Sequence, residues 1–312
     1  MSTFSQLLDY IENIRQNDYD DDMSVASTVI DDDNECGVVE ERRFVLSTPL
    51  DVVNRHPKDE HIAFQDEGHK YWIKSCDKNV ISTTTLIKEF FEEFDKHGII
   101  KRIMYSNKYL HDPTYLYYRK QASEIIEMWA KLGTKAAEAG SYNHLQIELY
   151  YNGQVADFTN KELHVLFKEF ARDHNHLEPY RTEMLMFHED LRITGSADII
   201  FRNPTTGKFV LADWKFIKKL TKKCKSKQAT GALSHLDDCN FTKYSLQLSI
   251  YRYILETEYG LEFEEQYLVI LHKKQKKYNK VPTEYLYKEV EEIFEMRRKQ
   301  QLEITSEKCN NV

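Results

Sequence analysis

The strongest constraint on the fold is a set of three strand-like runs between residues 182 and 216, in which apolar residues flank isolated acidic ones. The runs read TEMLMFHED, RITGSADIIF and KFVLADWKF. A tight turn at Glu189-Asp190 is expected to join the first two, and the segment from Asn203 to Gly207 carries the Pro and Gly that are typical of turns. The sequence therefore predicts an antiparallel meander.

The second turn determines which residues face each other. A hairpin that is symmetric about Thr205 and Thr206 places Asp198 opposite Asp213. Like charges at directly opposed positions are destabilising unless a cation neutralises them. Lys215 lies two residues beyond Asp213 and projects from the same face. Carboxylate ligands suit Mg2+ or Mn2+, which polarise phosphodiester oxygens and activate water.

The alternative interpretation is a solvated surface hairpin in which Asp and Lys pair across the strands. However, Gly195–Phe201 and Phe209–Phe216 are apolar on both sides of the acids. Strands without polar alternation are typical of buried central positions, where an unpaired carboxylate costs free energy. The apolar context therefore favours a buried carboxylate site.

These runs resemble the core of the PD-(D/E)XK nucleases, in particular the branch that contains RecB and the lambda exonuclease. GSADIIF followed by LADWKF carries the resemblance. GSYNHLQIE at Gly140–Glu148 resembles the helical G-T-x-x-H element of that branch, with Ser141 in the usual place of threonine. Glu183 resembles the acidic residue of the preceding strand, and YSLQLSIY from Tyr244 to Tyr251 resembles the Q-x-x-x-Y helix.

The resemblance implies a metal-dependent nuclease that acts on DNA, with exonuclease activity in replication, recombination or repair. The catalytic residues that it implies are Glu183, Asp198, Asp213 and Lys215, and the ligands of Mg2+ or Mn2+ are His144, Asp198 and Asp213. Gln247 and Tyr251 lie one turn apart on one helical face, which in the family lines the active site and contacts DNA. The five scattered cysteines offer no spacing for an iron-sulfur cluster.

The element pattern and the resemblance together predict an α/β (α+β) fold with a restriction-endonuclease-like core. We expect a central mixed β-sheet with an antiparallel meander, flanked by helices, and a helical N-terminal part. Residues 1–43 are expected to form an acidic, largely disordered arm, and residues 44–312 a single nuclease domain. Helices are expected over about 84–175, and the catalytic sheet with its helices over about 180–302. ISTTTLIKEFFEEFD predicts a strand end, a threonine cap and an amphipathic helix.

Charge is distributed unevenly along the chain. Residues 1 to 41 contain twelve acidic residues and one arginine, which gives −11, so the remainder carries +3 of the total of −8. A DNA partner is therefore compatible with the acidic total. The segment after Lys215 contains lysines that we expect to bind the DNA backbone, namely Lys218, Lys219, Lys222 and Lys223. A second group of lysines follows between residues 273 and 280. A solvated loop is the alternative for the first group.

The acidic arm has three interpretations: a DNA mimic that inhibits the site, an attachment to a basic protein partner, and a solubilising tail. The chain has no apolar run near about 18 residues and no basic, then apolar start, which argues against a membrane partner and against secretion. We expect an intracellular protein of the cytoplasm or nucleus. The pattern SxTTxI...FFxxFD also resembles uncharacterised nucleases of large DNA viruses and phages, which implies a host-cell location if the source is viral.

Two other functions remain open at this point. One is a DNA-binding or assembly module that keeps the nuclease fold without turnover, and the other is an RNA-directed nuclease with the same chemistry. Binding without cleavage would indicate the first, and preference for RNA over DNA of one sequence would indicate the second. Base-specific reading is not expected, because the sequence shows no helix-turn-helix or zinc finger. We expect binding that depends on DNA structure or on double- or single-stranded ends.

Overall fold

The computed structural model describes residues 48–65, 68, 70–76, 80–224 and 226–310, with side chains as far as residue 303. The predicted acidic arm, residues 1–43, and the expected domain start at residue 44 lie outside the described residues. Among the described helices, we find none that combines the length and the apolar character needed to cross a lipid bilayer.

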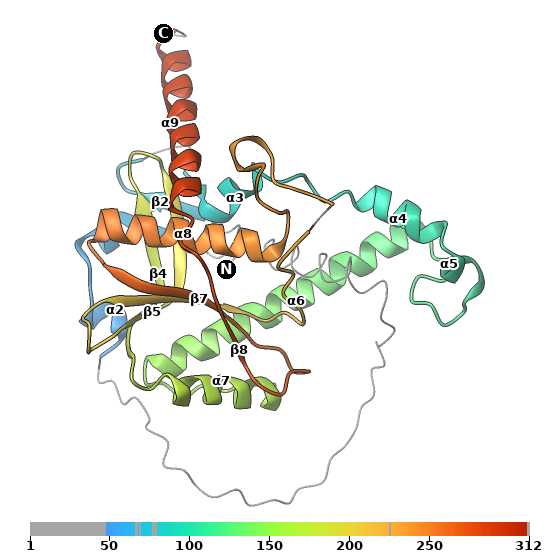
Figure 1. The fold of residues 1–312 in the computed structure, drawn as a ribbon, viewed down its shortest axis with the longest axis horizontal. Helices are drawn as coiled ribbons and strands as arrows, with labels where there is room; N and C mark the ends of the chain where they lie inside the picture. The colour runs from blue at the N-terminus through green and yellow to red at the C-terminus, as the bar shows by residue number, and fades with distance from the viewer. Residues whose placement is uncertain (1–47, 66–67, 69, 77–79, 225, 311–312) are drawn as a thin grey trace, which may run out of the picture.

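A six-stranded mixed sheet forms the centre of the fold (Figure 1). Its strands are β3 (Ile81–Ser82), β4 (Glu178–His188), β5 (Ile193–Arg202), β6 (Phe209–Lys215), β7 (Phe263–Ile270) and β8 (Asn279–Pro282). β4, β5 and β6 form the predicted antiparallel meander, β7 runs parallel to β6, and β8 returns antiparallel to β7. The predicted α/β class, a mixed sheet flanked by helices, is confirmed.

The hairpin of β5 and β6 has the register expected from its turn. Ile199 pairs with Ala212 and Phe201 pairs with Val210, as symmetry about Thr205 and Thr206 requires. Asp198 and Asp213 would be the next pair in this register, but the ladder ends at Ile199. The two strands therefore separate at the position of the two acids.

One edge of β5 lacks a strand neighbour along part of its length. β4 covers the opposite edge along the ladder from Ile193 to Arg202. The remaining edge is shared by β3, which pairs with Ile193 and Thr194, and by β6, which pairs from Ile199 onward. Within the described part of the chain, positions 195–198 of that edge have no strand partner. The sheet is thus interrupted beside Asp198.

Side-chain alternation also shifts at this point. Ala197 and Ile200 pack in one hydrophobic core, whereas Ile199 packs in the other. In an uninterrupted strand, positions 197 and 199 share one face. Opposite Asp198 on β4, Glu183 has a φ of 43°, in the left-handed region. A non-glycine residue there costs roughly 1–3 kcal/mol, and such strain is concentrated at functional sites.

Helices cover both faces of the sheet (Figure 1). The helices packed on one face are α3 (Thr83–Lys88), α8 (Asn240–Tyr259) and α9 (Tyr287–Asn310). The other face is covered by α7 (Lys161–Asp173) and the second half of α6 (Ala122–Tyr151). Phe167 and Phe170 of α7 pack edge to face on Trp214 of β6 in this second core. The sheet is therefore buried on both sides, as its apolar strands predicted.

The helical N-terminal part consists of α4 (Lys96–Met104), α5 (Asn107–His111) and the first half of α6. A small core that includes Ile99, Ile103 and Trp129 holds these helices together. The Trp129 indole N–H donates to the Tyr117 hydroxyl at 3.0 Å. Figure 1 shows α4 and α5 at the far end of α6, away from the sheet.

The segments before the sheet are short. They comprise α2 (Leu50–Val53), the 3-10 helix η1 (Pro57–His61), and a separate two-stranded sheet of β1 (Ile62–Gln65) and β2 (Lys70–Ile73). A second 3-10 helix, η2 (Gly231–Leu233), precedes α8.

The predicted boundaries of α3 were wrong in two respects. The cap is Ser82 rather than a threonine, because the Ser82 Oγ accepts a hydrogen bond from the Thr85 N–H at 3.2 Å. The helix ends at Lys88 instead of continuing through FFEEFD. Phe90 and Phe91 are both buried in the core packed around α8, so the chain turns there to place both rings inside.

Candidate metal centre

Three predicted site residues converge from three elements. His144 comes from α6, Glu183 from β4 and Asp198 from β5. The His144 Nδ1 lies 3.6 Å from the Glu183 Oε1 and 3.5 Å from the Asp198 Oδ2. One ligand atom of each residue lies within 4.8 Å of the others. One nitrogen and two carboxylate oxygens at these separations could hold a metal ion.

One backbone N–H and one side-chain hydroxyl hold the two acids of this cluster in place. The Trp214 N–H donates to the Asp198 Oδ2 at 2.8 Å, and the Ser196 hydroxyl donates to the Glu183 Oε2 at 3.1 Å. The Trp214 N–H can reach Asp198 because the β5–β6 ladder has already ended at Ile199. Local separation of the strands therefore positions the Asp198 carboxylate.

Asp213 and Lys215 lie beside the cluster on β6. The Lys215 Nζ lies 2.7 Å from the Asp213 Oδ2, and both side chains are almost fully buried. The Asp213 Oδ1 accepts no hydrogen bond from the described residues. Asp213 was predicted to be a metal ligand, whereas the cluster of three contains Glu183 in its place. The ammonium of Lys215 neutralises Asp213 in this arrangement.

Burial dominates the protonation of the cluster. Burial, followed by repulsion from Asp213, raises the pKa of Asp198 to about 8. Burial also raises the pKa of Glu183 to about 7 and lowers the pKa of His144 to about 4. The His144 Nδ1 accepts no hydrogen bond from the described residues. A divalent cation would reverse these shifts by favouring the ionised acids, so the donor set fits such an ion.

The predicted Gln247 and Tyr251 lie on α8 next to the acids. The Gln247 Nε2 donates to the Tyr251 hydroxyl at 3.0 Å, and both side chains are buried. A Cβ added at Gly195 would lie 2.3 Å from the Tyr251 Cε1, so only glycine fits beneath this ring. Burial raises the pKa of Tyr251, with smaller contributions that include Asp213 and Asp198. The pair thus borders the carboxylate cluster.

The four predicted DNA-binding lysines, Lys218, Lys219, Lys222 and Lys223, are exposed on the segment that leaves β6. They do not belong to the carboxylate cluster. Lys218 lies close enough to His272 to contribute, after burial and Lys273, to the lowered pKa of that histidine. The segment therefore adjoins the second group of lysines, which follows β7. Lys225 lies outside the described residues.

Sequence reasoning missed two residues at this site. Glu148 lies one helical turn after His144, and burial followed by repulsion from Glu183 raises its pKa to about 7. Tyr244 lies one turn before Gln247, with its ring centroid 4.7 Å from the Lys215 Nζ. Both could have been found from the helical spacing of residues three or four apart.

Comparison with known proteins gives no family. No family model and no curated protein matches the chain. Among solved structures, the crystal structure of SSO0001 has a TM-score of 0.32 and 14% identity, covering 72% of this chain and 78% of that one. A structure named "Putative exonuclease" from Eubacterium rectale has a TM-score of 0.31 and 13% identity, covering 61% of this chain and 67% of that one. Likeness at this level does not identify a family.

Proposed function

We propose that this chain is a Mg2+- or Mn2+-dependent nuclease of the PD-(D/E)XK type that hydrolyses DNA phosphodiester bonds. The supporting observation is the convergence of the buried His144 and Asp198 with the partly buried Glu183, beside the ion pair of Asp213 and Lys215. Three acids around one histidine are expensive to bury without a compensating cation. Lys215 pairs with one oxygen of Asp213, whereas the Asp213 Oδ1 accepts no hydrogen bond from the described residues. An acceptor oxygen therefore remains beside the cluster for a metal ion.

A bound divalent ion would polarise a phosphodiester oxygen and lower the pKa of a water molecule at the site. His144, Glu183 and Asp198 would hold the ion, and the free Oδ1 of Asp213 makes that residue the further candidate ligand. The Lys215 ammonium would orient the attacking water or stabilise the negative charge that develops on the phosphate.

DNA is the proposed substrate, and the exposed lysines after β6 are its proposed backbone contacts. Clustered lysines release counterions from a phosphate backbone, which makes binding strongly dependent on salt. Exonuclease action in replication, recombination or repair is the finer proposal, and it rests on the resemblance of the motifs around His144, Asp198 and Gln247.

The deciding experiment is a titration of Mg2+ and Mn2+ against 5′-labelled, 3′-labelled and circular DNA. We expect cleavage that needs the metal, and an exonuclease would leave circular DNA intact. Asp213→Ala and Lys215→Ala should each lower the rate by about 100-fold or more, the scale of losing one charge-stabilising group. Asp190→Ala, on the exposed turn between β4 and β5, is the control. Full activity in either site variant would remove these residues from the mechanism.

Two outcomes would replace the proposal. Salt-dependent DNA binding without cleavage under any metal condition would indicate a binding or assembly module. Faster cleavage of RNA than of DNA of the same sequence would indicate an RNA-directed nuclease with the same catalytic groups.

A further inference from the structure

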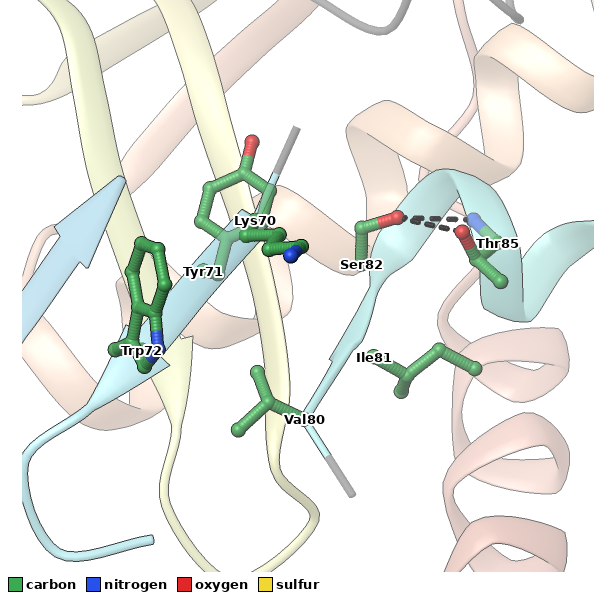
Figure 2. A pocket seen from close by; sticks show the side chains of 7 residues that line it. All are labelled: Lys70, Tyr71, Trp72, Val80, Ile81, Ser82 and Thr85. Carbon is green, nitrogen blue, oxygen red and sulfur yellow. Dashed lines mark hydrogen bonds between the residues drawn. The ribbon is translucent and has the colours of Figure 1, made fainter. Parts of the chain in front are cut away.

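A hollow of about 290 Å³ lies between the small β1–β2 sheet and the start of α3. Its lining residues are Lys70, Tyr71, Trp72, Val80, Ile81, Ser82 and Thr85. Figure 2 shows the Lys70 side chain extending from β2 toward Ser82, with the Tyr71 ring next to it, the Trp72 ring further along β2, and Val80 and Ile81 on the facing β3 segment. The hollow combines an aromatic surface, an ammonium group and apolar walls.

Two of its groups are available for a ligand. The Trp72 side chain is 46% exposed, whereas Trp129 and Trp214 are 4% and 1% exposed. Lys70 is exposed and has no ion pair or hydrogen bond with the described residues. The Ser82 and Thr85 hydroxyls, by contrast, are engaged with each other at 2.8 Å in the cap of α3. An exposed indole and an unpaired ammonium that line one hollow are suited to a base and its neighbouring phosphate.

The hollow is connected to the candidate metal centre along β5. β3, which lines the hollow, pairs Ser82 with Thr194. Asp198 lies four residues further along the same strand, about 13 Å at 3.3 Å per residue. This distance corresponds to about four nucleotides of a stacked strand, and to fewer of an extended one. Tyr251 packs on this stretch of β5 between the two places, since its ring lies against Gly195, one residue after Thr194 and three before Asp198.

We infer that this hollow is a subsite for an unpaired nucleotide of the substrate strand, with the base stacked on Trp72 and a phosphate next to Lys70. The inference rests on the proposed function, because it places the subsite a few nucleotides from the scissile bond. The volume of the hollow suits one planar base rather than a duplex. The subsite would select substrates that carry an unpaired stretch next to the cleaved bond.

The test uses the full chain in EDTA with an oligothymidylate of about ten nucleotides. Since Trp72 is the exposed tryptophan among the three, we expect saturable quenching of tryptophan fluorescence by the oligonucleotide. The variants lack the reporting indole, so their affinities and that of the wild type are compared by the fluorescence anisotropy of a dye-labelled oligothymidylate. Trp72→Ala should weaken binding about 5- to 150-fold, the range measured when a stacking aromatic is removed, and Trp72→Phe should retain most of the affinity. Lys70→Ala should lower the slope of log Kd against log salt by the amount expected for the loss of about one phosphate contact.

Matched controls separate stacking from general attraction. Lys74→Ala removes an exposed lysine just after β2, and Tyr105→Ala removes an exposed aromatic residue after α4, so neither should change the affinity. An abasic strand of the same length should bind wild type and Trp72→Ala equally, because it has no base to stack. Equal affinity of wild type and Trp72→Ala for the oligothymidylate would overturn the inference.

Cleavage by the wild type is measured in parallel with Mg2+, so that two failures can be told apart. Cleavage together with an unaffected Trp72→Ala variant overturns the subsite and leaves the nuclease proposal standing. Weakened binding by Trp72→Ala without any wild-type cleavage supports the subsite and overturns the nuclease proposal.

Discussion

Replacing Asp198 by asparagine should stabilise the metal-free protein while removing one residue of the candidate metal centre. Burial raises the pKa of Asp198 from 3.8 to about 8, so at pH 7 the folded protein holds a neutral carboxyl that the unfolded chain would ionise. The difference between pH 7 and the unfolded pKa is about 3 units, or on the order of 4 kcal/mol of lost stability. The amide oxygen of the new side chain could still accept a hydrogen bond from the Trp214 N–H, so the substitution removes the charge and keeps the hydrogen bond.

The dependence on pH determines whether Asp198→Asn stabilises or destabilises the protein at a given pH. A carboxyl with a raised folded-state pKa contributes its stability fully below pH 3.8 and loses it as the pH rises toward 8. The advantage of Asp198→Asn should therefore be near zero at pH 4, grow through neutral pH and level off above pH 8. On the scale of about 2–4 °C per kcal/mol, the expected gain in melting temperature at pH 7 is roughly 10 °C.

The assay is thermal unfolding in EDTA at a series of pH values, with Asp190→Asn on the exposed turn as the control. Mg2+ should raise the melting temperature of the wild type and leave Asp198→Asn unchanged, because ligands that bind only the folded state stabilise it. A variant that melts at or below the wild type at pH 8, or a gain that is the same at pH 4 and pH 8, would refute the reasoning.

Three further results are expected. Gly195→Ala should destabilise the fold by about 1–3 kcal/mol and displace Tyr251, measurable by thermal unfolding, because the new methyl group overlaps the ring. Glu183→Gly should melt higher than Glu183→Gln in EDTA, because glycine adopts the positive φ without strain; equal melting would show that the strain is negligible. Replacing all four exposed lysines after β6 by glutamine should lower the slope of log Kd against log salt for DNA by the amount expected for the loss of up to about four phosphate contacts. An unchanged slope would exclude that segment from DNA binding.

The sequence predicted the parts of the fold that follow from local rules. The turn at Thr205 and Thr206 determined the pairing of Ile199 with Ala212, because a short hairpin turn leaves one register. The apolar strands around Asp213 indicated burial on both faces, and the helix α7 was found within the range expected for helices. These features depend on turn chemistry and periodicity, which a single sequence contains.

The parts that could not be predicted depend on contacts between distant segments. The parallel pairing of β3 with the start of β5 joins residues more than one hundred positions apart, and nothing in either segment specifies the partner. Glu183 was predicted as a site residue, but its left-handed backbone, with a φ of 43°, is not indicated by its neighbours in the sequence. Packing of Tyr251 on Gly195 likewise requires α8 to be placed on the sheet first.

The interruption of β5 explains why the candidate site forms where it does. A continuous ladder would have paired the Trp214 N–H with a backbone carbonyl, and side-chain alternation would have kept positions 197 and 199 on one face. Because β3 and β6 leave positions 195–198 unpaired on one edge, the Trp214 N–H is free to donate to the Asp198 carboxylate, and Gly195 admits the Tyr251 ring. The same four positions thus supply the acid, the donor to Glu183 at Ser196 and the space for α8. A change that restored regular β pairing there would redirect the Trp214 N–H to a backbone carbonyl and remove the geometry of the candidate site.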